Sequence, residues 1–158
     1  LNNGQRLLAV NDLFIGPKSH VSARYVISID GREEQHSSSG VIVSTGLGST
    51  GWLKSLLAGA VGVANGLAGS DLAVSAQSSF NWDANYLLFT VREPFPSKTS
   101  AASLVFGKVT REAPLMLVSQ MPEKGVIFSD GIEDDFLEFN SGTKAMITIA
   151  DKKGRLVV

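Results

Sequence analysis

Short apolar segments separated by turn residues recur along much of the chain, which is typical of a β-rich protein. Residues 41–43 are three consecutive β-branched apolar residues and predict a buried strand. Residues 23–29 alternate apolar and polar positions, and Asp30-Gly31 after them predicts a tight hairpin into a polar edge strand at 32–36. The first third of the chain therefore predicts antiparallel strands.

The C-terminal third repeats short apolar segments at a spacing of about ten residues, with turns between them. This spacing predicts an all-β, or mainly β, fold built as a many-stranded β-sandwich. The strands expected there are 104–109, 115–119, 126–129, 136–139, 145–149 and 156–158. Two more strands are expected earlier, at 6–16 and at 86–93, the second ended by Pro94.

A glycine-rich turn follows the strand at 41–43 and leads into a helix expected to end near residue 64. Glycine allows a sharp turn and a close approach of the backbone to a ligand. The N-terminus of a helix carries free N–H groups and partial positive charge, so it suits phosphate or ribose oxygens. The glycines of the turn are Gly46, Gly48 and Gly51.

The residues on either side of this helix carry further predictions. Ser49 or Thr50 is expected to cap its N-terminus, because a hydroxyl accepts one of the free N–H groups. After the helix, Gly62, Gly66 and Gly69 are expected to break up the chain. Three aromatic residues follow and are expected to fill the core, with a pocket wall as the alternative. They are Phe80, Trp82 and Tyr86.

The glycine turn matches G-x-G-x-x-G, so a doubly wound dinucleotide-binding fold has to be considered. Asp71 lies twenty residues after Gly51, but it precedes the apolar stretch 72–74 where the ribose-binding acid should follow a strand. A nucleoside triphosphatase P-loop is excluded because no lysine follows the last glycine. A tight connection of purely structural origin remains an alternative.

Composition and charge narrow the classes of partner. The 158 residues suffice for one domain with a core, and 44% of them are hydrophobic. A formal net charge of −1 gives no argument for nucleic acid or an anionic membrane as a partner. The absence of cysteine excludes disulfides, and the apolar stretch 56–64 is shorter than the roughly 20 residues of a membrane span. We therefore expect a cytoplasmic protein.

Polar residues at three places are candidates for chemistry. Asn11-Asp12 interrupts an apolar run, so it is either a bulge or strand end, or a pair that binds ligand hydroxyls. His20 and His36 have no metal-ligand spacing and are expected to be exposed or structural. The acidic stretch 130–135 does not fit the calcium-loop pattern and is expected to be a solvated turn.

Three stretches together resemble NAD kinases. The run Ser-Gly-Val-Ile-Val-Ser-Thr-Gly-Leu-Gly-Ser-Thr-Gly-Trp at 39–52 resembles the second signature of that family, roughly D-G-L-I-V-S-T-P-T-G-S-T-A-Y. Ala-Val-Asn-Asp at 9–12 is similar to the family's Asn-Glu or Asn-Asp pair, and Ser-Asp-Gly at 129–131 to its D-G turn before the last strands. The resemblance implies a β-sandwich of the NAD kinase C-terminal type, with one short helix after the glycine-rich turn.

The resemblance also implies a function. The chain, residues 1–158, would be a single β-sandwich domain, a C-terminal fragment of a two-domain kinase that lacks the N-terminal G-G-D-G-T domain. The intact enzyme would use ATP and Mg²⁺ to phosphorylate the 2′-hydroxyl of NAD to give NADP. Because the chain carries no G-G-D-G-T motif, the fragment alone is expected not to catalyse and to hold neither catalytic residues nor a metal. Exposed strand edges would favour self-pairing, so a homo-oligomer is expected. By position, the substrate-binding residues would be Asn11, Asp12, Ser39, Ser49, Thr50, Gly51, Trp52 and Ser55.

Departures from the family pattern keep other functions open. Ser39 stands where the family has an acid, Gly46-Leu47 replaces Pro-Thr, and Trp52 replaces Tyr. These changes leave a sugar or lipid kinase domain as an alternative, with another phosphoryl acceptor. A non-catalytic β-rich interaction module is a further alternative. A serine hydrolase is disfavoured because the chain has no G-x-S-x-G elbow.

Overall fold

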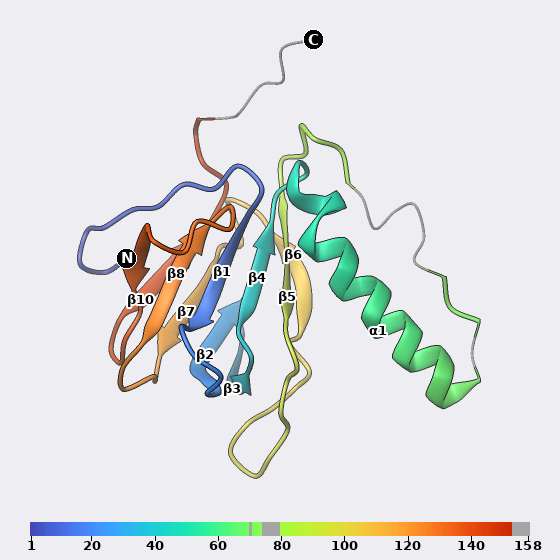
Figure 1. Ribbon diagram of the computed structural model, residues 1–158. Helices are drawn as coiled ribbons and strands as arrows, with labels where there is room; N and C mark the ends of the chain where they lie inside the picture. Colours follow the sequence, from blue (N-terminus) through green and yellow to red (C-terminus); the bar gives the residue numbers. More distant parts are fainter. Residues whose placement is uncertain (70, 74–79, 153–158) are drawn as a thin grey trace.

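The computed structural model describes residues 1–69, 71–73 and 80–152, and within these ranges the chain forms ten strands and one α-helix. Two antiparallel sheets pack face to face as a sandwich (Figure 1), which confirms the predicted mainly β architecture. The larger sheet has the order β6 (Phe106–Val109), β5 (Leu87–Val91), β4 (Val41–Ser44), β1 (Asp12–Pro17), β8 (Gly125–Ser129) and β9 (Phe136–Glu138). The smaller has the order β10 (Lys144–Ile147), β7 (Leu115–Ser119), β2 (Ala23–Ile29) and β3 (Arg32–Ser38).

The main core lies between the two sheets. Ile15, Val41 and Phe89 project into it from the larger sheet, and Ile27 and Leu117 from the smaller, and all five are fully buried. Because side chains alternate along a strand, the neighbours of these residues in the larger sheet face outward.

A second apolar cluster covers the outer face of the larger sheet. Phe14, Ile42 and Val126 are its buried members, and Trp52 and Leu56 from the helix pack against them. Strand β4 is therefore buried on both faces, which accounts for its uninterrupted apolar run.

The hairpin between β2 and β3 forms where it was predicted. Asp30 and Gly31 have φ values of 50° and 72°, the left-handed conformation that a two-residue hairpin turn with the twist of its strands requires. Ile29 pairs with Arg32 across the turn. Strand β3 is the edge strand of the smaller sheet, as its polar sequence predicted.

The helix α1 (Trp52–Ala68) follows a short 3₁₀ turn at Gly48–Thr50 and is longer than predicted. Gly62 and Gly66 lie inside it, so the prediction that they break the chain was wrong. A helical glycine costs only about 1 kcal/mol, and the leucine, alanine and valine residues around these positions maintain the helix. Gly69 ends it with φ 60° and an N–H donated to the carbonyl of Asn65.

The N-terminus of α1 also differs from the prediction. Gly51 is its N-cap, and no side chain caps it, so neither Ser49 nor Thr50 has the expected capping role. Leu53 is the buried residue of the helix, whereas Leu67 is 86% exposed. In Figure 1 the helix begins beside the end of β4, and its C-terminal half extends away from the sheets.

Several strands are shorter than their apolar patterns suggested. The strand expected at 6–16 begins only at Asp12. The N–H groups of Val10 and Asn11 donate instead to the carboxylate of Asp130, which lies in the connection between β8 and β9. The strand expected at 104–109 begins at Phe106, because the N–H of Leu104 donates to Glu34.

At the C-terminal side, the strand expected at 145–149 ends at Ile147, where its partner β7 begins. The strand expected at 156–158 lies outside the described residues. Among the described residues, no helix is long and apolar enough to cross a membrane.

Candidate functional site

The start of β1 is held by a carboxylate from the other end of the chain. Asp130 accepts hydrogen bonds from the backbone N–H groups of Val10 (2.9 Å), Asn11 (2.6 Å) and Asp12 (3.2 Å). Its own backbone N–H donates to the carbonyl of Asp12 at 2.9 Å. Hydrogen bonds to an ionised acceptor are stronger than neutral ones, so this carboxylate fixes the conformation of the Asn11-Asp12 segment.

The glycine-rich turn packs directly against the same segment. The N–H of Thr45 donates to the carbonyl of Asn11 at 2.9 Å. The Thr45 hydroxyl donates to the carbonyl of Val10 at 2.6 Å and accepts from the N–H of Gly48 at 3.2 Å. A Cβ at Gly48 would lie 2.1 Å from the carbonyl oxygen of Asn11, so only glycine permits this approach.

Asp12 is the half-buried acid at the centre of this arrangement. The hydrogen bonds between Asp12 and other described residues use its backbone N–H and C=O groups. None of these residues donates a hydrogen bond to its carboxylate. Burial, with a further contribution from the negative charge of Asp130, raises the pKa of Asp12 above its ordinary value. An acceptor of this kind beside a glycine turn is suited to a ligand that brings hydroxyl donors.

Two of the expected site serines already donate within the protein. The hydroxyl of Ser49 is buried and donates to the carbonyl of Gly46 at 2.7 Å. The hydroxyl of Ser55 is exposed and donates to the carbonyl of Trp52 at 2.8 Å. Both hydroxyls therefore stabilise the turn and the first turn of α1, and they keep only acceptor capacity for a ligand.

Ser39 is the expected site residue that lies apart from the others. It precedes β4, whereas the opposite end of β4, at Ser44, pairs with Asp12. Three residue steps along β4 place its two ends about 10 Å apart. The backbone N–H of Ser39 donates to the carbonyl of Arg92, so this serine belongs to the far end of the sheet.

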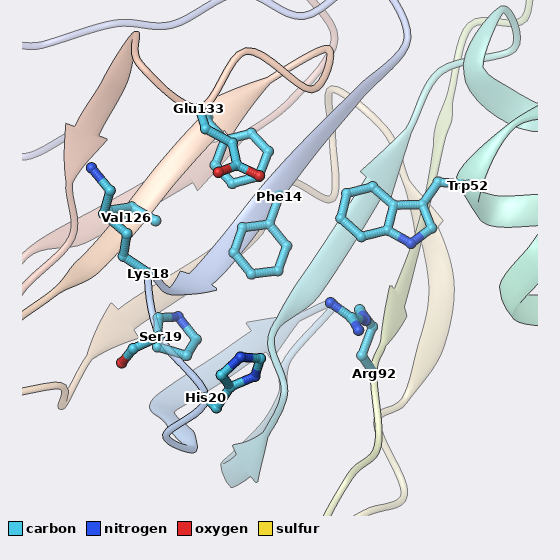
Figure 2. Close-up of a pocket in the computed structure, with 10 residues that line it drawn as sticks. Phe14, Lys18, Ser19, His20, Trp52, Arg92, Val126 and Glu133 are labelled. Atoms are coloured by element: carbon cyan, nitrogen blue, oxygen red, sulfur yellow. The ribbon is translucent and has the colours of Figure 1, made fainter.

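Two hollows flank the glycine turn and divide the remaining expected residues. Trp52 lines a hollow of about 290 Å³ on the outer face of the larger sheet, which Figure 2 shows around Phe14. Thr50 lines another, of about 430 Å³, together with the segment Phe80–Asp83. Gly51, which is exposed, lies between Thr50 and Trp52 in the sequence. The structure thus brings Asn11, Asp12 and the turn together, with a hollow on each side of the turn.

The aromatic residues of the 80–86 segment have different environments. Phe80 is buried and stacks on Tyr86 with ring centroids 4.9 Å apart, but neither residue belongs to the two apolar clusters of the described residues. Phe80 and Trp82 line the second hollow, which corresponds to the alternative of a pocket wall. Trp82 is 61% exposed, so the prediction that it fills the core was wrong. Its segment covers the glycine turn, because a Cβ at Gly46 would lie 2.1 Å from the carbonyl oxygen of Asn81.

Sequence reasoning missed the role of Asp130, which it placed in a solvated turn. The only local signal is the Asp-Gly pair, since Asp130 and Gly131 both have positive φ values, of 54° and 74°. Nothing in that signal names the N–H groups of residues 10–12 as partners, because they lie about 120 residues away in the chain.

The described residues do not supply a metal-binding cage. They contain no group of three or more histidine, cysteine, aspartate or glutamate side chains placed to hold an ion. Both carboxylate oxygens of Asp130 already accept N–H groups, which leaves Asp12 alone beside it. His36 is buried and bonded to Glu34 at 2.9 Å, and His20 is exposed, as expected of structural and surface histidines.

Comparison with known proteins identifies the fold. No protein-family model matches the chain, and a search of curated protein sequences gave no match. An NAD kinase structure from Archaeoglobus fulgidus in complex with ATP matches with a TM-score of 0.60 at 18% identity, over 92% of this chain and 47% of that one. The yeast NADH kinase structure complexed with NADH matches with a TM-score of 0.54 at 19% identity, over 86% of this chain and 33% of that one.

The present chain thus spans about half or less of each of these kinases. At such identities the likeness establishes the fold. Almost the whole of this chain is covered in the first comparison, so the two-sheet sandwich as a unit shares its fold with part of that NAD kinase.

Proposed function

We propose that this chain is the substrate-binding domain of an NAD kinase-like phosphotransferase, with NAD bound at the Asn11-Asp12 segment. The observation that carries the proposal is the unpartnered, half-buried Asp12 carboxylate beside the glycine turn, in a fold shared with NAD kinases. A carboxylate can accept two ribose hydroxyls, and the exposed Asn11 amide can donate to a neighbouring oxygen. The two neighbours were solved with ATP and with NADH, which supports a nucleotide as the ligand.

The intact enzyme would transfer a phosphoryl group from ATP to the 2′-hydroxyl of NAD. Phosphoryl transfer needs a positioned base and charge neutralisation at the phosphates, and the described residues offer no metal cage for that task. The role proposed for this domain is therefore to hold and orient the acceptor ribose. We expect the purified 158-residue chain, given ATP and Mg²⁺, to show no NAD phosphorylation. Turnover close to that of an intact kinase would contradict this division of labour.

Calorimetric titration with NAD tests the proposed site. Asp12→Ala should abolish binding while leaving the fold intact, because the carboxylate is the acceptor proposed for the ribose. Asp134→Ala is the matched control, since it removes an exposed carboxylate from the acidic turn. Equal NAD affinity in wild type and Asp12→Ala would refute the proposed site. A β-rich interaction module predicts that outcome, with any effect of Asp12→Ala confined to stability.

We also propose that the protein is cytoplasmic and self-associates. The support for self-association is the apolar surface of α1, on which Val63 is 62% and Leu67 86% exposed. Light scattering after size-exclusion chromatography should show an oligomer, and Leu67→Glu should weaken it. A monomer at all concentrations would contradict the proposal.

A further inference from the structure

The hollow around Phe14 lies at the other end of β1 from Asp12. Its walls come from the turn after β1, from the residue after β5 and from the first residue of α1, represented by His20, Arg92 and Trp52. Five residues of β1 separate Asp12 from Pro17, which is about 17 Å along an extended strand. The hollow is therefore a separate place on the same sheet face.

The floor of this hollow is aromatic. The ring centroids of Phe14 and Trp52 lie 5.9 Å apart, and their ring planes are within 9° of parallel. The ring centroids of Phe14 and Phe128 lie 4.9 Å apart. The two ring planes of Phe14 and Trp52 are nearly parallel, and Trp52 is the more exposed of the two, so a planar ring can stack on Trp52 with Phe14 beneath it. Stacking of a nucleobase on an aromatic side chain contributes about 1–3 kcal/mol.

One side of the hollow is basic. Figure 2 shows the imidazole of His20 and the guanidinium of Arg92 below Phe14 and Trp52, with Glu133 toward the opposite end of the hollow. The guanidinium carbon of Arg92 lies 5.4 Å from the Trp52 ring centroid. Lys18 does not belong to this side, because Figure 2 shows its side chain directed away from Arg92 and its ammonium lies 4.2 Å from the ring centroid of Phe136.

Arg92 has hydrogen-bonding capacity that the described residues leave unused. Its buried Nε–H has no partner among them. Its one ion pair is with Glu93 at 3.8 Å, and that carboxylate side chain is 65% exposed, so the pair is weak. A planar guanidinium with free donors is the group best suited to bind a phosphate in a bidentate manner.

We propose that this hollow binds an aromatic compound that carries a phosphate group, of the class of nucleoside monophosphates. The ring lies against Trp52, above the buried Phe14, and the phosphate is bound by Arg92. The volume of about 290 Å³ is at the lower end for ligand pockets, which favours a mononucleotide over a whole dinucleotide. The inference goes beyond the proposed NAD site, because Asn11 and Asp12 do not line this hollow.

The test is titration of the purified protein with AMP, adenosine and inorganic phosphate, followed by calorimetry and by tryptophan fluorescence. Trp82→Phe is the background for fluorescence, so that Trp52 reports alone. We expect AMP to quench Trp52 and to bind at least about tenfold more tightly than adenosine or phosphate, because it engages both the floor and the basic side.

Substitutions then separate the two parts of the site. Arg92→Gln should weaken AMP binding about tenfold and leave adenosine binding unchanged, since a charge-assisted phosphate contact is lost. Arg92→Lys should retain most of the affinity. Lys18→Gln should leave AMP affinity unchanged, because the Lys18 ammonium lies over Phe136 and away from Arg92. Arg111→Gln and Lys98→Gln are the matched controls with no effect expected.

Three results would overturn the proposal. They are AMP binding no tighter than adenosine, AMP affinity unchanged in Arg92→Gln, and no heat or fluorescence change with AMP at millimolar concentration. The outcome is independent of the NAD titration with Asp12→Ala, because the probes and the substituted residues differ.

Discussion

The close packing of the glycine turn on the start of β1 makes Gly48→Ala a sharp test of the structure. A Cβ at position 48 would lie 2.1 Å from the carbonyl oxygen of Asn11 and 2.6 Å from its carbonyl carbon. The oxygen contact is about 1.3 Å shorter than an ordinary one of 3.4 Å. Both atoms are backbone, so neither can swing aside, and the turn has to move away from β1.

The cost follows from what that movement breaks. The bonds from Thr45 N–H to the carbonyl of Asn11 and from the Thr45 hydroxyl to the carbonyl of Val10 join the two segments. Each such bond contributes about 1 kcal/mol, and overpacking adds about 1–3 kcal/mol. We expect Gly48→Ala to lower the free energy of unfolding by about 3 kcal/mol, which for a chain of this size lowers Tm by about 6–12 °C.

Urea denaturation measures this change in the free energy of unfolding, with Gly62→Ala as the control for Gly48→Ala. Nothing lies within 4 Å of a Cβ at Gly62, which is exposed in the middle of α1. The same substitution there should therefore stabilise the protein, by about 0.5–1 kcal/mol, because alanine is the better helix former. Opposite signs at the two positions are expected. A Gly48→Ala protein as stable as wild type would refute the packing of the turn against Asn11.

Three further predictions concern carboxylates. Because burial and Asp130 raise the pKa of Asp12 in the folded state, stability is favoured while this group is protonated and falls as pH rises through the raised pKa. Asp12→Asn should thus be more stable than wild type at pH 7 in urea denaturation, with the gain vanishing in acid, and no gain at pH 7 would contradict the raised pKa. Asp130→Ala should lower the free energy of unfolding by about 2–3 kcal/mol, since three N–H groups lose their acceptor and alanine has to adopt φ 54°. Unchanged hydrogen exchange at those three amides would refute the assigned role of Asp130. Burial of Glu34 would raise its pKa, but hydrogen bonds from Ser103 and His36 and from backbone N–H groups outweigh this and lower it to about 2. The stabilisation is thus present above the ordinary pKa and lost as pH falls from 4.5 toward 2. Glu34→Gln should therefore lower the free energy of unfolding by about 2 kcal/mol at pH 7 and by little near pH 2. An equal loss at both pH values would contradict the lowered pKa.

Local patterns were sufficient to predict many of the elements. The β-branched run at 41–43 forms β4, and Asp30-Gly31 forms the predicted hairpin between β2 and β3. The regular spacing of the C-terminal segments corresponds to strands of the sandwich. Gly46 and Gly48 were expected to let the backbone approach a ligand, whereas in the structure they lie against the chain's own backbone at Asn81 and Asn11. These features depend on residues adjacent in the chain, where backbone preference and side-chain alternation act directly.

Packing between distant segments decided the element ends and the candidate site. Val10 and Asn11 leave the ladder because Asp130 takes their N–H groups, and Leu104 leaves it because Glu34 does the same. A carboxylate accepts from any N–H group that the fold brings within reach, so sequence alone does not name its partner.

The hollow around Phe14 has the same origin. Phe14, Trp52 and Arg92 carry no shared motif, and they meet only because β1, β4 and β5 are neighbours in one sheet and α1 begins beside them. The sequence by itself determined the strands, the hairpin and the glycine turn, because these arise from local backbone preferences. The tertiary structure alone decided which charges and rings face each other, because that depends on how two sheets and a helix pack.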